Sequence, residues 1–306
     1  MDERGRGILA MIGTCLVWGL SPLYYKLLAH VPPPEVLSHR TFWSVLLFGV
    51  YLAIQGRLGE LRRAYAGPRQ TGLIALAAVM ISLNWFVFIL SIQLGHATEA
   101  SMGYYIFPLI AVLIGRFWFG ERLSGGQWLA VVLAALAVAL LTWGLGVAPW
   151  VALILSCSFA LYGAVKKFLP LGPVISVTAE IVIMMPLFLS VLAWFHLRGQ
   201  GAFGGDLATS LLLIGSGPLT AIPLILFSYA ARRVPLSTVG VLQYINPTLQ
   251  FMCAVVIFGE PFTRWHGIAF ALIWGAVAVF SLSLVRQDRA ARRAVMAASG
   301  VSTQVR

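Results

Sequence analysis

Long apolar runs separated by short polar breaks form the dominant pattern of the sequence. Each run holds about 20 mostly apolar residues, enough to cross a bilayer as a helix. Strands of a membrane barrel would alternate in polarity over about ten residues, and these runs do not. The pattern predicts an all-α polytopic membrane protein with ten transmembrane helices, at about residues 8–28, 36–55, 71–94, 98–118, 127–146, 149–166, 174–195, 207–230, 235–258 and 265–285.

Two of these runs carry the same motif. Tyr105, Pro108, Phe119, Gly120 and Glu121 recur 139 residues later as Tyr244, Pro247, Phe258, Gly259 and Glu260. The offset is five helices, an odd number, so the second copy has the opposite orientation in the membrane. We therefore predict two inverted five-helix repeats, at residues 1–146 and 149–285, and a disordered cytoplasmic tail at 286–306. Such an architecture places a site near the midplane, between the halves, and lets it open to either side in turn.

Composition and charge agree with a membrane location. The chain is 60% hydrophobic and only 10% charged, whereas about a quarter of the residues in soluble domains are charged. If the N-terminus is cytoplasmic, sixteen Lys and Arg residues lie on the inside and only Arg198 and Arg264 lie in outside loops. The bias predicts that both termini are cytoplasmic. It also explains the net charge of +11 without a nucleic-acid partner, and none is expected.

Motifs for catalysis or cofactor binding are absent from the sequence. Cys15, Cys157 and Cys253 each lie inside an apolar run, without the spacing of a metal site or a disulfide set. No phosphate-binding loop, zinc-protease motif or nucleophile elbow is present. We expect no catalytic residue, no metal and no cofactor, and hence no enzyme. The first apolar run lacks a cleavage site and is expected to be a retained helix.

Prolines interrupt the repeated motif and indicate where a central cavity lies. Pro108 and Pro247 have no N–H, so each frees the carbonyl four residues earlier, which needs a protein or water partner at membrane depth. We predict helix kinks at both prolines and a substrate site beside them; ordinary interhelical packing is the alternative. The candidate substrate-binding residues are Asn84, Trp85, Tyr105, Glu180, Gln243, Tyr244 and Asn246.

Charged residues within the runs are further candidates. Glu180 lies six residues into its run, too deep for its short side chain to reach the interface. It either takes part in transport, by exchanging a proton or binding a cationic group, or forms a structural ion pair with Lys166 or Lys167. Arg40 occupies the matching repeat position, 140 residues earlier. From their depths we expect about 14 Å between the axial levels of Arg40 and Glu180, so the two should not touch.

A set of ordered motifs resembles a known family. The chain contains, in order, HRTFWS (39–44), NW (84–85), EASMGYYIFPL (99–109), GERLSGGQWLAV (120–131), LYGAVKK (161–167) and LSTVGVLQYINPTL (236–249). This series is similar to the RarD-type branch of the EamA family, in the drug/metabolite transporter superfamily. The resemblance implies ten helices in two inverted repeats and a metabolite transporter of the bacterial inner membrane, in a branch named for chloramphenicol sensitivity. Family members often have Asn-Pro in the fourth helix, where this chain has Phe107-Pro108.

Together these features predict a secondary transporter. It would move a small organic metabolite or drug-like solute across the inner membrane by alternating access. The expected partners are the small-molecule substrate and the lipid bilayer. Protons or a counter-substrate are both open as the coupling partner, and so are a monomer and a homodimer. A membrane-embedded enzyme and a non-transporting membrane partner or sensor are the alternative functions.

Overall fold

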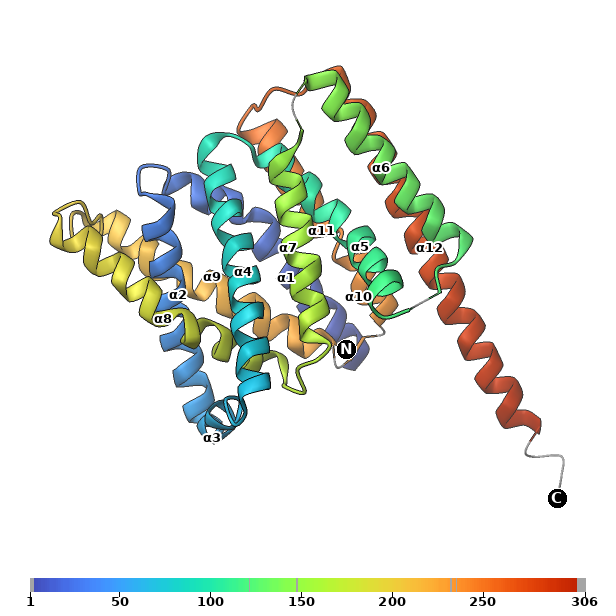
Figure 1. Ribbon diagram of the computed structural model, residues 1–306, viewed down its shortest axis with the longest axis horizontal. Coiled ribbons are helices and arrows are strands. Elements are labelled where there is room, and N and C mark those ends of the chain that lie inside the picture. Colours follow the sequence, from blue (N-terminus) through green and yellow to red (C-terminus); the bar gives the residue numbers. More distant parts are fainter. Residues whose placement is uncertain (1–2, 121, 147, 232, 235, 302–306) are drawn as a thin grey trace.

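Helices form almost all of the protein in the computed structural model, which describes residues 3–120, 122–146, 148–231, 233–234 and 236–301 (Figure 1). The first half contains α1 (Glu3–Leu27), α2 (Pro33–Ile54), the short α3 (Leu58–Arg63), α4 (Pro68–Leu94), α5 (Ala97–Trp118) and α6 (Gly125–Leu145). The second half contains α7 (Trp150–Lys166), α8 (Pro173–Leu197), α9 (Leu207–Ala231), α10 (Leu236–Leu242), α11 (Ile245–Met252), a π-helical turn (Cys253–Ile257) and α12 (Arg264–Val301). Glu121, one member of the repeated motif, lies outside the described residues.

Eight of the described helices are long and apolar enough to cross a membrane. The apolar helices Trp150–Lys166 and Ile245–Ile257 are shorter. The prediction of an all-α polytopic membrane protein is thus confirmed. The run at 235–258 is not one continuous helix, however, because the helix is interrupted between the end of α10 and the start of α11.

Helix contacts follow the repeat. If the five long helices of the first half correspond in order to those of the second, the main contacts between the halves have counterparts. The contact of α5 with α7 matches that of α1 with α11, and α4 on α7 matches α1 on α9. The contact of α4 with α8 matches that of α2 with α9, while α2–α8, α5–α11 and α6–α12 pair equivalent helices. Two similar halves that face each other give this pattern.

Glycine permits close helix approach at two equivalent interfaces. A Cβ atom at Gly103 of α5 would lie 2.9 Å from the carbonyl oxygen of Ala152 in α7. A Cβ atom at Gly19 of α1 would lie 2.7 Å from the Cβ of Leu249 in α11. Small residues let helix backbones approach where lipid supplies no hydrophobic force between them. Equivalent interfaces of the two halves therefore use the same packing device.

Helix α12 extends beyond its membrane-spanning part. It continues to Val301, well past residue 285. The segment RAARRAVMAA is rich in alanine and arginine, two of the strongest helix formers, and extends a helix already nucleated in the membrane. Figure 1 shows α6 and α12 side by side at the edge of the molecule, with α12 projecting beyond the bundle.

Candidate functional site

The break between α10 and α11 is the main irregularity in the transmembrane part. Pro247 cannot donate to the carbonyl of Gln243, and that carbonyl instead accepts from the backbone N–H of Asn246 at 3.1 Å. The chain therefore makes a turn at Gln243 and Tyr244. In the first half, α5 continues through Pro108 without a break. The helix is thus interrupted in the second half and continuous at the matching place in the first half; kinks at Pro108 and Pro247 stay predictions.

Tyrosines from both halves meet beside this break. The rings of Tyr105 and Tyr244 stack with centroids 6.2 Å apart and planes 15° from parallel. The hydroxyl of Tyr105 shares a hydrogen bond of 2.6 Å with that of Thr248. The buried hydroxyl of Tyr244 has no hydrogen-bond partner in the described part of the chain. Of the two tyrosines, only Tyr244 has a polar group free for a solute.

The amide side chains next to the break differ in their surroundings. Asn246 uses its Oδ1 to accept from Nε2 of Gln250 at 3.0 Å, within the same helix. Gln243 is half-buried, in the turn between α10 and α11. Three predicted site residues, Gln243, Tyr244 and Asn246, therefore lie together at the break between α10 and α11.

Asn84 belongs to a different group of contacts. It is fully buried in α4, and its Nδ2 donates to the carbonyl of Leu155 at 2.9 Å and to Ser158 at 3.1 Å, both in α7. Its Oδ1 accepts from the hydroxyl of Tyr104 in α5 at 2.9 Å. All three bonds hold helices together. This geometry favours the packing alternative for Asn84.

Arg40 and Trp85 form a third group. The guanidinium carbon of Arg40 lies 4.2 Å from the centroid of the Trp85 ring. Its Nε donates to the hydroxyl of Thr220 in α9 at 2.6 Å. Arg40 is only 6% exposed, so this cation lies in the interior where α2, α4 and α9 meet. The role of Thr220 could not be predicted from the sequence, because its partner Arg40 lies 180 residues away in the chain.

Glu180 is fully buried and forms the ion pair that was one of its two predicted roles. Its Oε1 pairs with Lys166 and accepts from Ser176 at 2.9 Å, and its Oε2 accepts from Tyr162 at 3.0 Å. Lys167 lies instead over the ring of Phe119, at 4.4 Å. Arg40 and Glu180 form no ion pair with each other.

Glu260 is a polar residue that the repeat motif marked without revealing its role. Its carboxylate accepts from the N–H groups of Ala97 and Thr98, and from the hydroxyl of Thr98, each at 2.7 Å. A residue of the second half thus caps the N-terminus of α5 in the first half, where a negative charge is favoured. Glu35 of α2 makes the same kind of link with the halves exchanged, because its Oε1 accepts from the backbone N–H of Ala202 in the second half at 2.7 Å.

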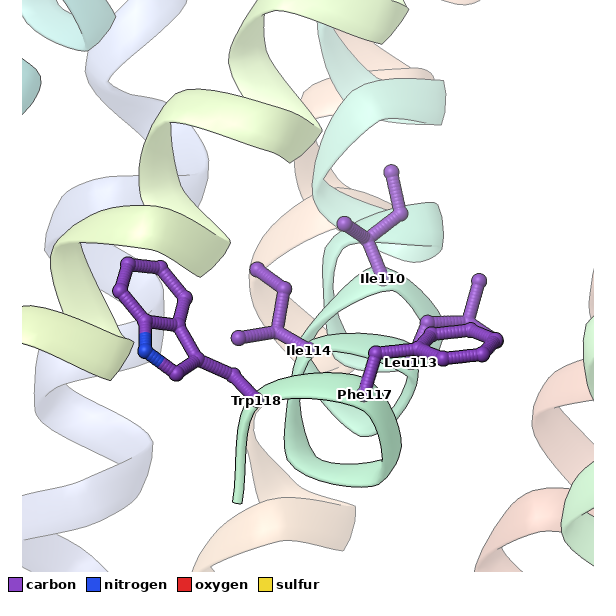
Figure 2. A pocket seen from close by; sticks show the side chains of 5 residues that line it. All are labelled: Ile110, Leu113, Ile114, Phe117 and Trp118. Atoms are coloured by element: carbon purple, nitrogen blue, oxygen red, sulfur yellow. The ribbon is translucent and has the colours of Figure 1, made fainter. Parts of the chain in front are cut away.

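An apolar groove of about 440 Å³ lies apart from these groups (Figure 2). Figure 2 shows that its walls come from the C-terminal half of α5. Its lining residues are Ile110, Leu113, Ile114, Phe117 and Trp118. No charged side chain lines it, and such a surface suits acyl chains. Among the described residues, no group of three or more His, Cys, Asp or Glu is placed to hold a metal ion.

A multi-pass helical bundle built from two related halves, with polar groups buried where they meet, is the architecture of small-molecule membrane transporters. More particularly, the chain belongs to the EamA-like transporter family, which matches residues 5–143 and 147–282. The resemblance to the RarD-type branch is confirmed. The chain is a multi-pass protein of the bacterial inner membrane, and a membrane transporter of the drug/metabolite type.

Individual relatives extend over almost the whole chain. A protein named RarD from Streptomyces exfoliatus is 41% identical over 97% of this chain and 95% of its own length. A Vibrio cholerae protein named as an uncharacterized transporter is 38% identical over 96% of this chain and 97% of its own. A solved crystal structure shares the fold, with a TM-score of 0.57 and 20% identity over 92% of this chain and 98% of that one.

Proposed function

We propose that this protein is a secondary transporter that moves a small organic metabolite or drug-like solute by alternating access. The observation that carries the proposal is the break at Gln243 and Tyr244, next to which α11 packs against α5 of the other half. A broken helix at membrane depth is tolerated where it is covered by protein or lines a wet cavity. In transporters built from repeats, such breaks form the substrate site.

The repeats and their orientation belong to the same proposal. Residues 1–146 and 149–285 form the two inverted halves, and both termini are cytoplasmic. With this orientation, the bonds of Glu260 and Glu35 both lie at the outer ends of helices and each joins one half to the other. We assign them as outer latches, which are made when the outside is closed and must break when it opens.

The site chemistry supports transport over the two alternative functions. The polar groups beside the break are a phenol and two amides, which suit binding of an organic solute but lack the nucleophile or acid–base pair of an enzyme. A sensor has no need of a break at the interface of two halves. Protons or a counter-substrate drive the cycle. Glu180 serves as a structural tie in the conformation described, and a proton role would require its ion pair with Lys166 to open.

The test is uptake into proteoliposomes of a panel of small organic solutes, compared with protein-free liposomes. Tyr244→Phe removes the unpaired hydroxyl and keeps the ring stack, so uptake should fall by about tenfold while the folded amount is unchanged. The matched control is Tyr51→Phe, a tyrosine at the far end of α2. Equal losses of uptake and folded protein in Tyr244→Phe would support the packing alternative. Release of a chemically altered solute would support an enzyme.

Coupling is tested with the same vesicles. Uptake driven by an imposed proton gradient is compared between the wild type and Glu180→Gln. A coupling role predicts that the variant folds but loses the response to the gradient. Poor folding that is rescued by also neutralising Lys166 identifies a purely structural tie.

A further inference from the structure

Arg40 stands out among the buried charges because no carboxylate reaches it. Three other helices contact its side chain. Thr220 of α9 accepts from Nε at 2.6 Å, Trp85 of α4 lies under the guanidinium at 4.2 Å, and the ring of Tyr25 in α1 lies on another side. The Tyr25 ring centroid is 5.7 Å from the guanidinium carbon. The partners supply one hydroxyl oxygen and two aromatic faces, and no negative charge.

The carboxylates that could neutralise Arg40 are engaged elsewhere. Glu180 is held by Lys166. Glu35, five residues before Arg40 on α2, points to His39 and the Ala202 N–H. Among the described residues, no ion pair includes Arg40. A guanidinium keeps its charge in any protein environment, so burial cannot be relieved by loss of a proton. An unneutralised cation at this depth costs several kcal/mol unless a function requires it.

We propose that Arg40 binds the carboxylate of an amphipathic organic anion, which is the solute that the transporter carries. This inference rests on the proposed function and adds the class of substrate. A guanidinium has five N–H donors in a planar fork, and that fork matches a carboxylate with two parallel hydrogen bonds. The Thr220 hydrogen bond and the rings of Trp85 and Tyr25 hold the guanidinium in place, so its geometry is set before the solute arrives.

The surroundings favour a carboxylate with an apolar body. Tyr25, Phe88 and Leu37 belong to one apolar cluster against which Trp85 and Tyr104 also pack. These walls suit an aromatic or aliphatic group next to the charge. A phosphate monoester carries nearly two negative charges at neutral pH, whereas the contacts described at this site include a single cation, Arg40. A singly charged organic acid therefore matches the site better than a phosphate ester.

A purely structural role is the competing explanation, because Arg40 also joins α2 to α9 and α4. The two roles differ in ligand selectivity. A structural arginine changes stability whether or not a solute is present. A carboxylate-binding arginine also makes the protein prefer an acid over its uncharged amide, and that preference should disappear when the guanidinium is removed.

The experiment measures binding without transport, on the full chain in lipid nanodiscs. Probes are matched pairs of aromatic and aliphatic acids and their amides, beginning with 3-phenylpropionate and 3-phenylpropanamide, with thermal unfolding as the readout. A ligand that binds only the folded form raises the unfolding midpoint. We expect at least one acid to bind at least about 30-fold more tightly than its amide, and Arg40→Gln to abolish the difference.

The matched control is Arg198→Gln. That arginine lies over the Trp194 ring at 4.4 Å, nearly the same cation–π geometry, but on the exposed end of α8. It should keep the preference for the acid. If Arg40→Gln is not recovered folded, Arg40→Lys replaces it, since it keeps the charge but not the fork and should lower the preference. Equal binding of acid and amide in every pair, or a preference unchanged in the Arg40 variant, would overturn the inference.

Transport assays separate this inference from the proposed function. If the protein prefers acids in nanodiscs but takes up no solute into vesicles, the carboxylate site at Arg40 is supported and the proposed transport function is refuted. If the protein takes up neutral or cationic solutes and Arg40→Gln does so equally well, the transport function is supported and the carboxylate site at Arg40 is refuted.

Discussion

Removal of the Glu260 cap should weaken closure of the outer side. Glu260 follows α11 in the second half and reaches α5 of the first half, where it accepts three hydrogen bonds of 2.7 Å. In Glu260→Ala the N–H groups of Ala97 and Thr98 lose this partner, and the two halves lose a link. Glu260→Gln keeps one acceptor oxygen and removes the charge, so its effect should be about half as large.

The magnitude follows from the number and kind of these bonds. A hydrogen bond to a charged group contributes about 1.5–3 kcal/mol when shielded, and a helix N-cap contributes about 1 kcal/mol when exposed. Glu260 is partly exposed, which places the whole cap between these limits, at about 2 kcal/mol. If the cap is made only when the outside is closed, its loss should increase the outward-open population about 30-fold.

The assay uses cysteine labelling beneath the cap. Ser101 is fully buried in the first turns of α5, and Ser101→Cys can be placed in a chain whose three native cysteines are replaced. A membrane-impermeant maleimide should label this cysteine about 30-fold faster in Glu260→Ala, because the labelling rate follows the outward-open population. The control is Glu99→Gln, which disrupts a pair with His96 in the same half. Unchanged labelling, with lower thermal stability alone, would show that Glu260 is a local cap and not a latch.

Three further outcomes are expected. Asn84→Ala should reduce the folded amount and uptake in parallel, at a cost of about 2–4 kcal/mol, because partners on two other helices are left unpaired; this is checked by fluorescence-detected size-exclusion chromatography. Gly103→Ala should destabilise by about 1–3 kcal/mol in thermal unfolding, whereas Gly49→Ala, with nothing within 4 Å of the added carbon, should not. The pKa of Asp206 lies below its usual value, chiefly because the carboxylate accepts from the N–H of Thr209. The stability that ionised Asp206 gives to the folded protein is therefore present above the ordinary Asp pKa of about 3.9 and is lost as the pH falls through the lowered value. In Asp206→Asn, the thermal unfolding midpoint should therefore depend less on pH in the acid range.

Much of the fold could be predicted from the sequence because lipid imposes a simple rule. A stretch such as 71–94 has to be a helix, since its backbone has no other hydrogen-bond partner in a bilayer. The repeat was visible for a similar reason, because Tyr105 and Tyr244 occupy the same place in each copy. The break at Gln243 was harder to predict, since both prolines interrupt the same hydrogen bond and only one of the helices breaks.

The candidate site was predictable in part only. Residue type and depth identified Glu180 and Arg40, but not what each would meet in space. Lys166 lies 14 residues before Glu180 and was within reach of reasoning from the sequence. Thr220 lies 180 residues after Arg40, and no periodicity connects them. Polar partners on distant helices depend on packing, which a single sequence does not encode in any local pattern.

The pairing of α6 with α12 sets an order of assembly. Helix α6 packs mainly against α12, whose membrane part begins at Arg264, near the end of the chain. A ribosome that adds about 5–20 residues per second leaves α6 without this partner for roughly 7 to 28 s. During that interval the uncovered face of α6 is in contact with lipid or with an insertion factor. A message truncated before Arg264 would therefore yield a protein with a permanently unpaired helix, which is a recognisable substrate for membrane proteases.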